Sequence, residues 1–345
     1  MLELIEGHFI VLICISFGNT IAFFSLNLKK PDQMIAKKVR HIIYFAVGAF
    51  IGAAVVTGVA FKQADEAEEP VEVKKDGRLQ YKWYSPELPK SLSFAGERVP
   101  LERRDIKEQL DRELLYNYYN QYSTIYILKL ADRYFPLIEP MLKANGIPDD
   151  FKYLCIAESA LQNQTSRAGA VGFWQFMPAT APQYGLEVSD DVDERYHVAK
   201  STDAASKYFR QAYDRFNSWT AAAASYNMGQ GGYNGQSTFQ QTSDYYSLML
   251  PEETMRYVFR ILAFKLLVGE AQKYGYIVGS SDSYKPIKTR TISVSSNIPN
   301  LAQFAIDNGT TYRALKQLNP WLRERKLTVK AGKTYEIAIP ATAMK

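Results

Sequence analysis

The chain has 345 residues, 47% of them hydrophobic, and a formal net charge of +5. This length predicts more than one folded unit, and the small positive charge is not the strongly basic surface that a nucleic-acid-binding protein needs. The scattered histidines, His8, His41 and His197, argue against a zinc cluster or a histidine-based triad. Cys14 and Cys155 do not suggest a disulfide framework, and we expect no metal or other cofactor.

The chain opens with two apolar stretches, residues 9–28 and 42–61, each of 20 residues without a charge. Each is long enough to cross a bilayer. The basic loop between them predicts a cytoplasmic connection, which places everything after residue 61 on the outer side. A start at Met34 is an alternative that leaves one anchor or a signal peptide. We therefore expect membrane-anchoring segments over residues 1–61 and a charged, proline-marked tether over residues 62–100.

Residues 101–275 are predicted to form a mainly α-helical domain. Ile106, Leu110 and Leu114 recur at helical spacing in the stretch 101–143, and Pro136 and Pro140 are expected to break its end. Further helices are predicted over residues 202–216 and 252–267.

A carboxylate interrupts an apolar helical stripe in the segment 151–159. Glu158 lies four residues after Leu154 and three after Cys155, so it continues the buried face of that helix. Because burial disfavours the ionised form, this position predicts a raised pKa and a partly protonated acid near neutrality, as a general acid requires. The alternative is a buried glutamate neutralised by a distant arginine or lysine.

The next segment, AGAVGFWQFMPATA at residues 168–181, is rich in aromatic side chains. Gly169 and Gly172 let the backbone approach a ligand closely or adopt positive φ. Aromatic rings with the amide of Gln175 suit a hydroxylated sugar ring, although such a cluster is also typical of ordinary core. The acidic run at 189–196 lacks the spacing of a calcium loop and is predicted to be a solvated turn with Arg195 as a local partner.

Two later helices carry polar groups that could face a cleft. The Ala-rich segment 219–232 brings Tyr226 and Asn227 to its C-terminal end, where Asn227 could instead serve only as a cap. The segment 250–267 carries Tyr257, which could equally be core.

These segments, in this order, resemble the lytic transglycosylases with a goose-lysozyme-like catalytic domain, most closely their membrane-bound D type. The resemblance covers about residues 100–270 and rests on Glu158 with Ser159, GxxGxWQFMPxTA at 169–181, AxxxYNxG at 222–229 and ETxxYVxxxLA at 253–263. It implies a lysozyme-like, helix-rich α+β catalytic domain.

The resemblance also implies roles for individual residues. Glu158 matches the single catalytic acid, and Ser159 matches the neighbour that helps to position acid and substrate. The residues matching those that contact the glycan are Gln175, Met177, Tyr226, Asn227 and Tyr257. Arg167, Met228 and Gln230 depart from common family residues, and none of them touches the proposed acid.

The implied reaction cleaves the β-1,4 bond between N-acetylmuramic acid and N-acetylglucosamine in peptidoglycan and leaves a 1,6-anhydromuramic end. A two-carboxylate hydrolase needs a second acid across the bond, and Glu253 is the one competitor, better explained as a first-turn helix acid. A hydrolytic lysozyme and a noncatalytic wall-binding scaffold remain alternatives. The expected location is the bacterial cell envelope, with the catalytic domain on the periplasmic side.

The tail, residues 288–341, combines two β-prone runs with two helix-like pieces between them. This βααβ order resembles a LysM module, which implies binding of glycan strands through N-acetylglucosamine. The usual Gly-Asp-Thr turn is replaced by SNIPN at residues 296–300, so glycan binding and a purely packing role both stay open.

Overall fold

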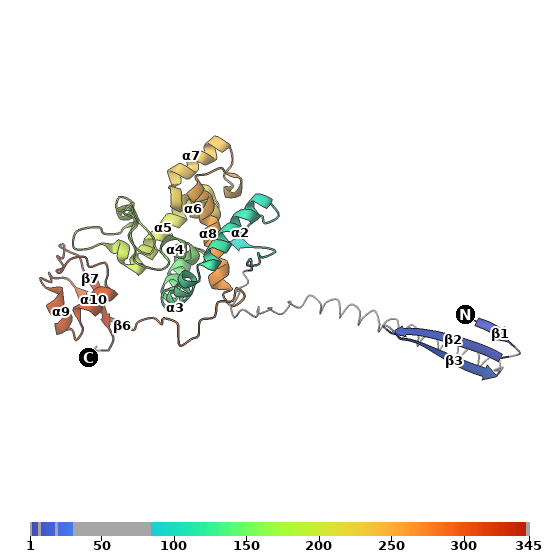
Figure 1. Cartoon of the computed structure of the whole chain (residues 1–345). Helices are drawn as coiled ribbons and strands as arrows, with labels where there is room; N and C mark the ends of the chain where they lie inside the picture. Colours follow the sequence, from blue (N-terminus) through green and yellow to red (C-terminus); the bar gives the residue numbers. More distant parts are fainter. Residues whose placement is uncertain (1, 6–7, 18–19, 30–83, 343–345) are drawn as a thin grey trace, which may run out of the picture. The chain divides into compact units, whose positions relative to one another are not determined.

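The computed structural model describes residues 2–5, 8–17, 20–29 and 84–342 (Figure 1). It divides into two compact units, Met1–Lys82 and Trp83–Lys345, which we describe separately.

The described part of the N-terminal unit is an antiparallel sheet in the order β1-β2-β3. Its strands are β1 (Leu2–Ile5), β2 (His8–Phe17) and β3 (Thr20–Lys29). Phe17 pairs with Thr20 and His8 with Lys29, so the described residues of the predicted span at 9–28 form two paired strands in this structure. β-Branched and aromatic residues, which favour strands, are frequent in β2 and β3. The second apolar stretch, 42–61, lies outside the described residues.

No helix within the described ranges is both long and apolar enough for a transmembrane span.

The larger unit is helix-rich, as predicted, and is organised around one central helix. The helices before the C-terminal module are α2 (Arg104–Tyr119), α3 (Gln121–Ala144), α4 (Phe151–Ser159), α5 (Val198–Phe216), α6 (Trp219–Met228), α7 (Gln230–Gln240) and α8 (Glu252–Gly269). Helix α8 packs against α2, α3, α4 and α6 (Figure 1). Its side chains Val258, Ile261 and Leu262 have no exposed surface, so α8 supplies much of the core.

Short elements connect these helices. They are the hairpin β4 (Ser93–Phe94) and β5 (Glu97–Arg98) and the 3₁₀ turns η1 (Ala181–Tyr184), η2 (Glu194–Tyr196) and η3 (Tyr245–Ser247). The hairpin has a structural task, since the Glu97 carboxylate accepts hydrogen bonds from the backbone N–H groups of Trp219 (2.6 Å) and Thr220 (2.8 Å). It thereby caps α6, whose far end carries two of the predicted site residues.

The predicted break at Pro136 and Pro140 is wrong, because both prolines lie inside α3. A proline removes one backbone hydrogen bond and crowds the preceding turn. Here the buried side chains Ile138 and Leu142, each 0% exposed, hold the following turns against the core, and the helix continues to Ala144.

The C-terminal module has the order βααβ. Its elements are β6 (Thr289–Val294), α9 (Leu301–Asp307), α10 (Tyr312–Leu318) and β7 (Tyr335–Pro340). Strands β6 and β7 are antiparallel, with Val294 opposite Tyr335.

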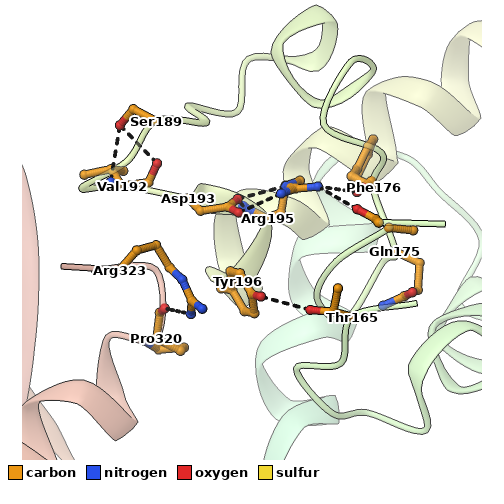
Figure 2. Close-up of polar contacts among 12 residues, drawn as sticks. Thr165, Gln175, Phe176, Ser189, Val192, Asp193, Arg195, Tyr196, Pro320 and Arg323 are labelled. Atoms are coloured by element: carbon orange, nitrogen blue, oxygen red, sulfur yellow. Dashed lines mark hydrogen bonds and ion pairs between the residues drawn. The ribbon is translucent and has the colours of Figure 1, made fainter. Parts of the chain in front are cut away.

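The module packs on the segment 187–196 of the helical domain (Figure 2). The Asp193 N–H donates to the Trp321 carbonyl, and the Arg323 N–H donates to the Asp191 carbonyl, both at 2.9 Å. Val192 from the helical domain, 1% exposed, is part of the module's own hydrophobic core. A cavity of about 420 Å³ lies beside this contact, and none of the predicted site residues lines it.

Candidate active site

The proposed acid lies at the C-terminal end of α4. Leu154 and Cys155 are fully buried, as predicted, and anchor the helix in the core. Glu158 itself is half-buried, and the chain turns away at Ala160, which adopts the left-handed conformation with φ 52°. The carboxyl is therefore shielded by protein while the residue keeps some exposed surface.

Tyr257 on α8 holds this carboxyl directly. Its hydroxyl donates a hydrogen bond to Glu158 Oε1. Burial raises the pKa of Glu158 to about 7; the hydrogen bond from Tyr257 and the charge of Arg260 oppose that rise, and Glu253 adds to it. Because burial outweighs these opposing effects, the group holds a proton through most of the acidic range.

Tyr226 and Asn227 at the end of α6 border this pair. The Tyr226 hydroxyl donates to the Trp174 carbonyl at 2.6 Å, and burial together with the nearby Glu158 charge raises the Tyr226 pKa. Asn227 Oδ1 accepts a hydrogen bond of 2.7 Å from the hydroxyl of Thr254, one turn before Tyr257 on α8. Both residues are half-buried, so α6, α8 and the aromatic loop meet at the acid.

The loop 169–177 has a backbone that depends on glycine. Gly172 has φ +84°, and a Cβ at this position would lie 2.0 Å from the Arg195 carbonyl oxygen. Gln175, with φ 48°, folds its amide back so that Nε2 donates to the Gly172 carbonyl at 2.7 Å and to the Gln164 carbonyl at 3.2 Å. Met177 follows with 39% of its surface exposed.

Arg195 fixes this loop by binding its backbone carbonyls (Figure 2). Its guanidinium donates to the carbonyl oxygens of Gly169 and Phe176, each at 3.1 Å. It also forms a bidentate ion pair with Asp193, through Nε at 2.9 Å and Nη2 at 2.8 Å. Both side chains are buried, so the predicted solvated turn is wrong at these residues, because the pair neutralises itself while the arginine satisfies loop carbonyls.

The predicted site residues differ in how directly they contact Glu158. Glu158 and Tyr257 touch, Tyr226 lies within electrostatic reach of the acid, and Asn227 is tied to the same helix as Tyr257. Ser159 is different, since it is 3% exposed and its hydroxyl donates to the Cys155 carbonyl at 3.2 Å.

Sequence reasoning missed the contribution of Arg260. It lies three residues after Tyr257, inside the ETxxYVxxxLA segment at a position that this pattern leaves open. The helical spacing could have placed it beside Tyr257, since residues three apart are neighbours on a helix surface. Glu253, the competing carboxylate, is 59% exposed and lies 3.1 Å from Arg260 Nη1.

Most of the predicted site residues lie in a segment that matches a known protein family. Residues 136–248 match the transglycosylase SLT domain family. The predicted family resemblance is confirmed. A second match, over residues 290–343, is to the soluble lytic transglycosylase C-terminal LysM-like domain family.

Two curated relatives give the extent of the similarity. Membrane-bound lytic murein transglycosylase D of Escherichia coli (strain K12) is 28% identical over 236 residues, which cover 66% of this chain and 51% of the relative. The putative tributyltin chloride resistance protein of Alteromonas sp. (strain M-1) is 29% identical over 103 residues, which cover 29% of this chain and 50% of that protein. The chain spans about half the length of the curated relatives it matches.

Proposed function

We propose that the protein is a peptidoglycan lytic transglycosylase that cleaves the β-1,4 bond between N-acetylmuramic acid and N-acetylglucosamine. The observation that carries this proposal is the state of Glu158 within an SLT domain, where burial raises the pKa of the carboxyl to about 7. A carboxyl that is still protonated near neutrality can donate to a leaving oxygen.

In the first step, Glu158 donates its proton to the oxygen that links the two sugars. The bond from that oxygen to C1 of the muramic ring breaks, and the ring takes on oxocarbenium character. Tyr257, already bonded to Glu158 Oε1, stabilises the carboxylate as it forms.

In the second step, the same carboxylate acts as the base. It removes the proton from the C6 hydroxyl of the muramic sugar, whose oxygen attacks C1 and closes the 1,6-anhydro ring. Glu158 regains its proton, and no water is consumed. One carboxyl is sufficient for this sequence, and the exposed, Arg260-paired Glu253 fits a supporting position better than that of a second catalytic acid.

The remaining predicted residues would shape the glycan groove. Tyr226 and Asn227 stand at the end of α6 beside the acid, and Gln175 and Met177 lie on the loop that Tyr226 contacts through Trp174. Ser159 would support α4 through its bond to the Cys155 carbonyl, in keeping with its predicted positioning role.

We place the enzyme in the bacterial cell envelope, with its helical domain on the periplasmic side. The apolar stretch 42–61, which stays a candidate span, supports membrane attachment, and one relative is named as membrane-bound. The C-terminal module is proposed to contact glycan strands as well, since it matches the LysM-like family.

Digestion of purified peptidoglycan sacculi by the full-length chain tests the proposed function. We expect soluble muropeptides with 1,6-anhydro ends, which mass spectrometry distinguishes because they are lighter than hydrolytic products by one water. Products with reducing ends instead would make the protein a lysozyme. Binding to sacculi without any release would identify a noncatalytic scaffold.

A further inference from the structure

A second buried glutamate lies near the active site and has no part in the two steps above. Glu113, on α2, is 1% exposed, and its Oε2 has no hydrogen-bond partner in the described structure. Burying a carboxylate is costly unless cations and hydrogen bonds compensate it. Glu113 therefore needs cationic partners nearby.

Two arginines of α8 provide the compensation. Arg256 Nε lies 2.6 Å from Glu113 Oε1, and Arg260 Nε lies 3.7 Å from Glu113 Oε2. The two arginine side chains are about one-quarter exposed. Since residues four apart share one face of a helix, Glu113 holds this face of α8 against α2.

Arg260 connects this cluster to the catalytic acid. It lies on the helix surface next to Tyr257, which binds Glu158, and its positive charge opposes the rise in the pKa of Glu158 that burial causes. Two carboxylates, Glu113 and Glu253, share that positive charge. The positive potential at Glu158 thus depends on how fully Arg260 is neutralised.

The other groups that face Glu158 come from three helices. They are Cys155 on α4, Tyr226 on α6, and Glu253, Tyr257 and Arg260 on α8. Burial raises the pKa values of Cys155, Tyr226 and Tyr257 well above their ordinary values, so these groups stay neutral through the physiological range. Arg260 and Glu253 are the groups of this set that carry charge there.

We propose that Glu113 is a positioning residue for the lytic reaction: it fixes Arg260 beside Tyr257 and neutralises part of the arginine's charge, so that Glu158 keeps its proton until substrate arrives. This inference rests on the proposed function. Glu113 is 1% exposed, so it is proposed to influence Glu158 through Arg260 and not by touching substrate.

The direct test is Glu113→Gln in the full-length chain, with the pH dependence of kcat as the readout. The variant removes one negative charge and leaves Arg260 less neutralised, which lowers the pKa of Glu158. We expect the alkaline limb of the profile to move to lower pH by about half a unit or more, while kcat at acidic pH stays near wild type. Lower thermal stability with an unmoved limb would show that Glu113 is only structural.

Arg260→Gln should act in the opposite direction. It removes the positive charge and leaves Glu253 unpaired, and both changes raise the pKa of Glu158, so the alkaline limb moves to higher pH. Arg260→Lys restores the charge and should return the limb close to wild type. If Glu113→Gln does not fold, Arg260→Gln and Arg260→Lys test the proposal instead. An alkaline limb that has the same position in both variants would overturn it.

Glu252→Gln is the matched control. Glu252 is the first residue of α8 and lies 3.9 Å from Arg256 Nη1, but its side chain is 69% exposed. Solvent screens this carboxylate, so we expect an unmoved limb. A shift equal to that of Glu113→Gln would mean that any carboxylate on α8 or α2 has the same effect, which contradicts a specific role for Glu113.

A direct titration separates this inference from the proposed reaction. The Glu158 side-chain carbon can be followed by ¹³C NMR in glutamate-labelled protein and assigned by its absence in Glu158→Gln. We expect a lower pKa of Glu158 in Glu113→Gln than in wild type. If wild type releases no anhydro product, the proposed function fails, while the titration still supports or rejects the link between Glu113 and Glu158.

Discussion

Glu158 at the proposed active site and Glu187 at the contact with the C-terminal module show opposite behaviour of the same side chain. Both carboxyls are shielded by protein. Burial raises the pKa of Glu158 to about 7. At Glu187 burial acts in the same direction, but hydrogen bonds from Lys333, Lys330 and Tyr335 outweigh it and lower the pKa to about 2.

The difference lies in the partners. Glu187, with its side chain 8% exposed, has Lys330 Nζ at 3.0 Å from Oε1 and the Tyr335 hydroxyl at 2.9 Å from Oε2, and Lys333 also contacts it. Glu158 has a neutral phenol as its direct partner and an arginine that other carboxylates neutralise. A carboxyl surrounded by direct cations becomes a fixed anion, whereas one that meets a phenol keeps an exchangeable proton.

The largest expected effect is on activity, which should fall in Glu158→Gln and not in Glu187→Gln. Glu158→Gln removes the proton donor and should lower kcat by about 10²–10⁴-fold, the usual contribution of a general acid or base. Release of muropeptides from sacculi measures the effect. Glu187→Gln makes the same chemical change away from the acid and should retain most activity. Equal losses in the two variants would remove Glu158 from its assigned role.

Part of this proposed site can be predicted from the sequence alone. The stripe of Leu154, Cys155 and Glu158 is sufficient to predict the inward face of α4 and the direction of the Glu158 pKa shift, because helical periodicity is a local property. The contact from Tyr257 came only through the family resemblance, since α4 and α8 are about 100 residues apart in the chain.

Other features depend on tertiary contacts that no local pattern contains. Charge in the run 189–196 predicted a solvated turn, but Arg195 is buried because distant carbonyls of the loop 169–177 accept its hydrogen bonds. Val192 completes the core of a module that begins about 100 residues later. The hydrophobicity of residues 9–28 predicts a membrane span, and the structure pairs residues 8–17 with residues 20–29 as strands β2 and β3.

The pH dependence of stability should differ in sign at the two sites. The folded-state pKa of Glu158, about 7, lies above its ordinary value of 4.5, so its contribution is fully present below pH 4.5 and is lost as pH rises through 7. At pH 8, Glu158→Gln should therefore increase the free energy of unfolding by about 1–3 kcal/mol, since a buried charge is removed. Urea unfolding at pH 5 and pH 8 measures this gain, and a loss at pH 8 would mean that the ionised carboxylate is well compensated.

Glu187→Gln should give a smaller change of opposite sign. Its folded-state pKa, about 2, lies below the ordinary value of 4.5, so its contribution is present above pH 4.5 and is lost as pH falls through 2. Because the two lysines are 63% and 45% exposed, we expect a loss of only about 1–2 kcal/mol at pH 7. Unfolding of the variant and wild type at pH 7 and pH 2 checks this, and the two curves should converge at the lower pH.

The smallest expected effect concerns the neutral partner of Glu158. Tyr257→Phe removes a hydrogen bond that favours the carboxylate, so the pKa of Glu158 rises and the alkaline limb of the kcat profile should move up by about 0.5–1 pH unit. The limb does not belong to Tyr257 itself, because burial holds the pKa of that phenol well above its ordinary value. Tyr226→Phe is the matched control, because it loses the bond to the Trp174 carbonyl but no bond to Glu158. We expect any loss of activity in this variant to come from a changed loop conformation, with the alkaline limb in its wild-type position. A limb that moves equally in both variants would indicate that loop geometry, rather than the Tyr257 hydrogen bond, controls the proton on Glu158.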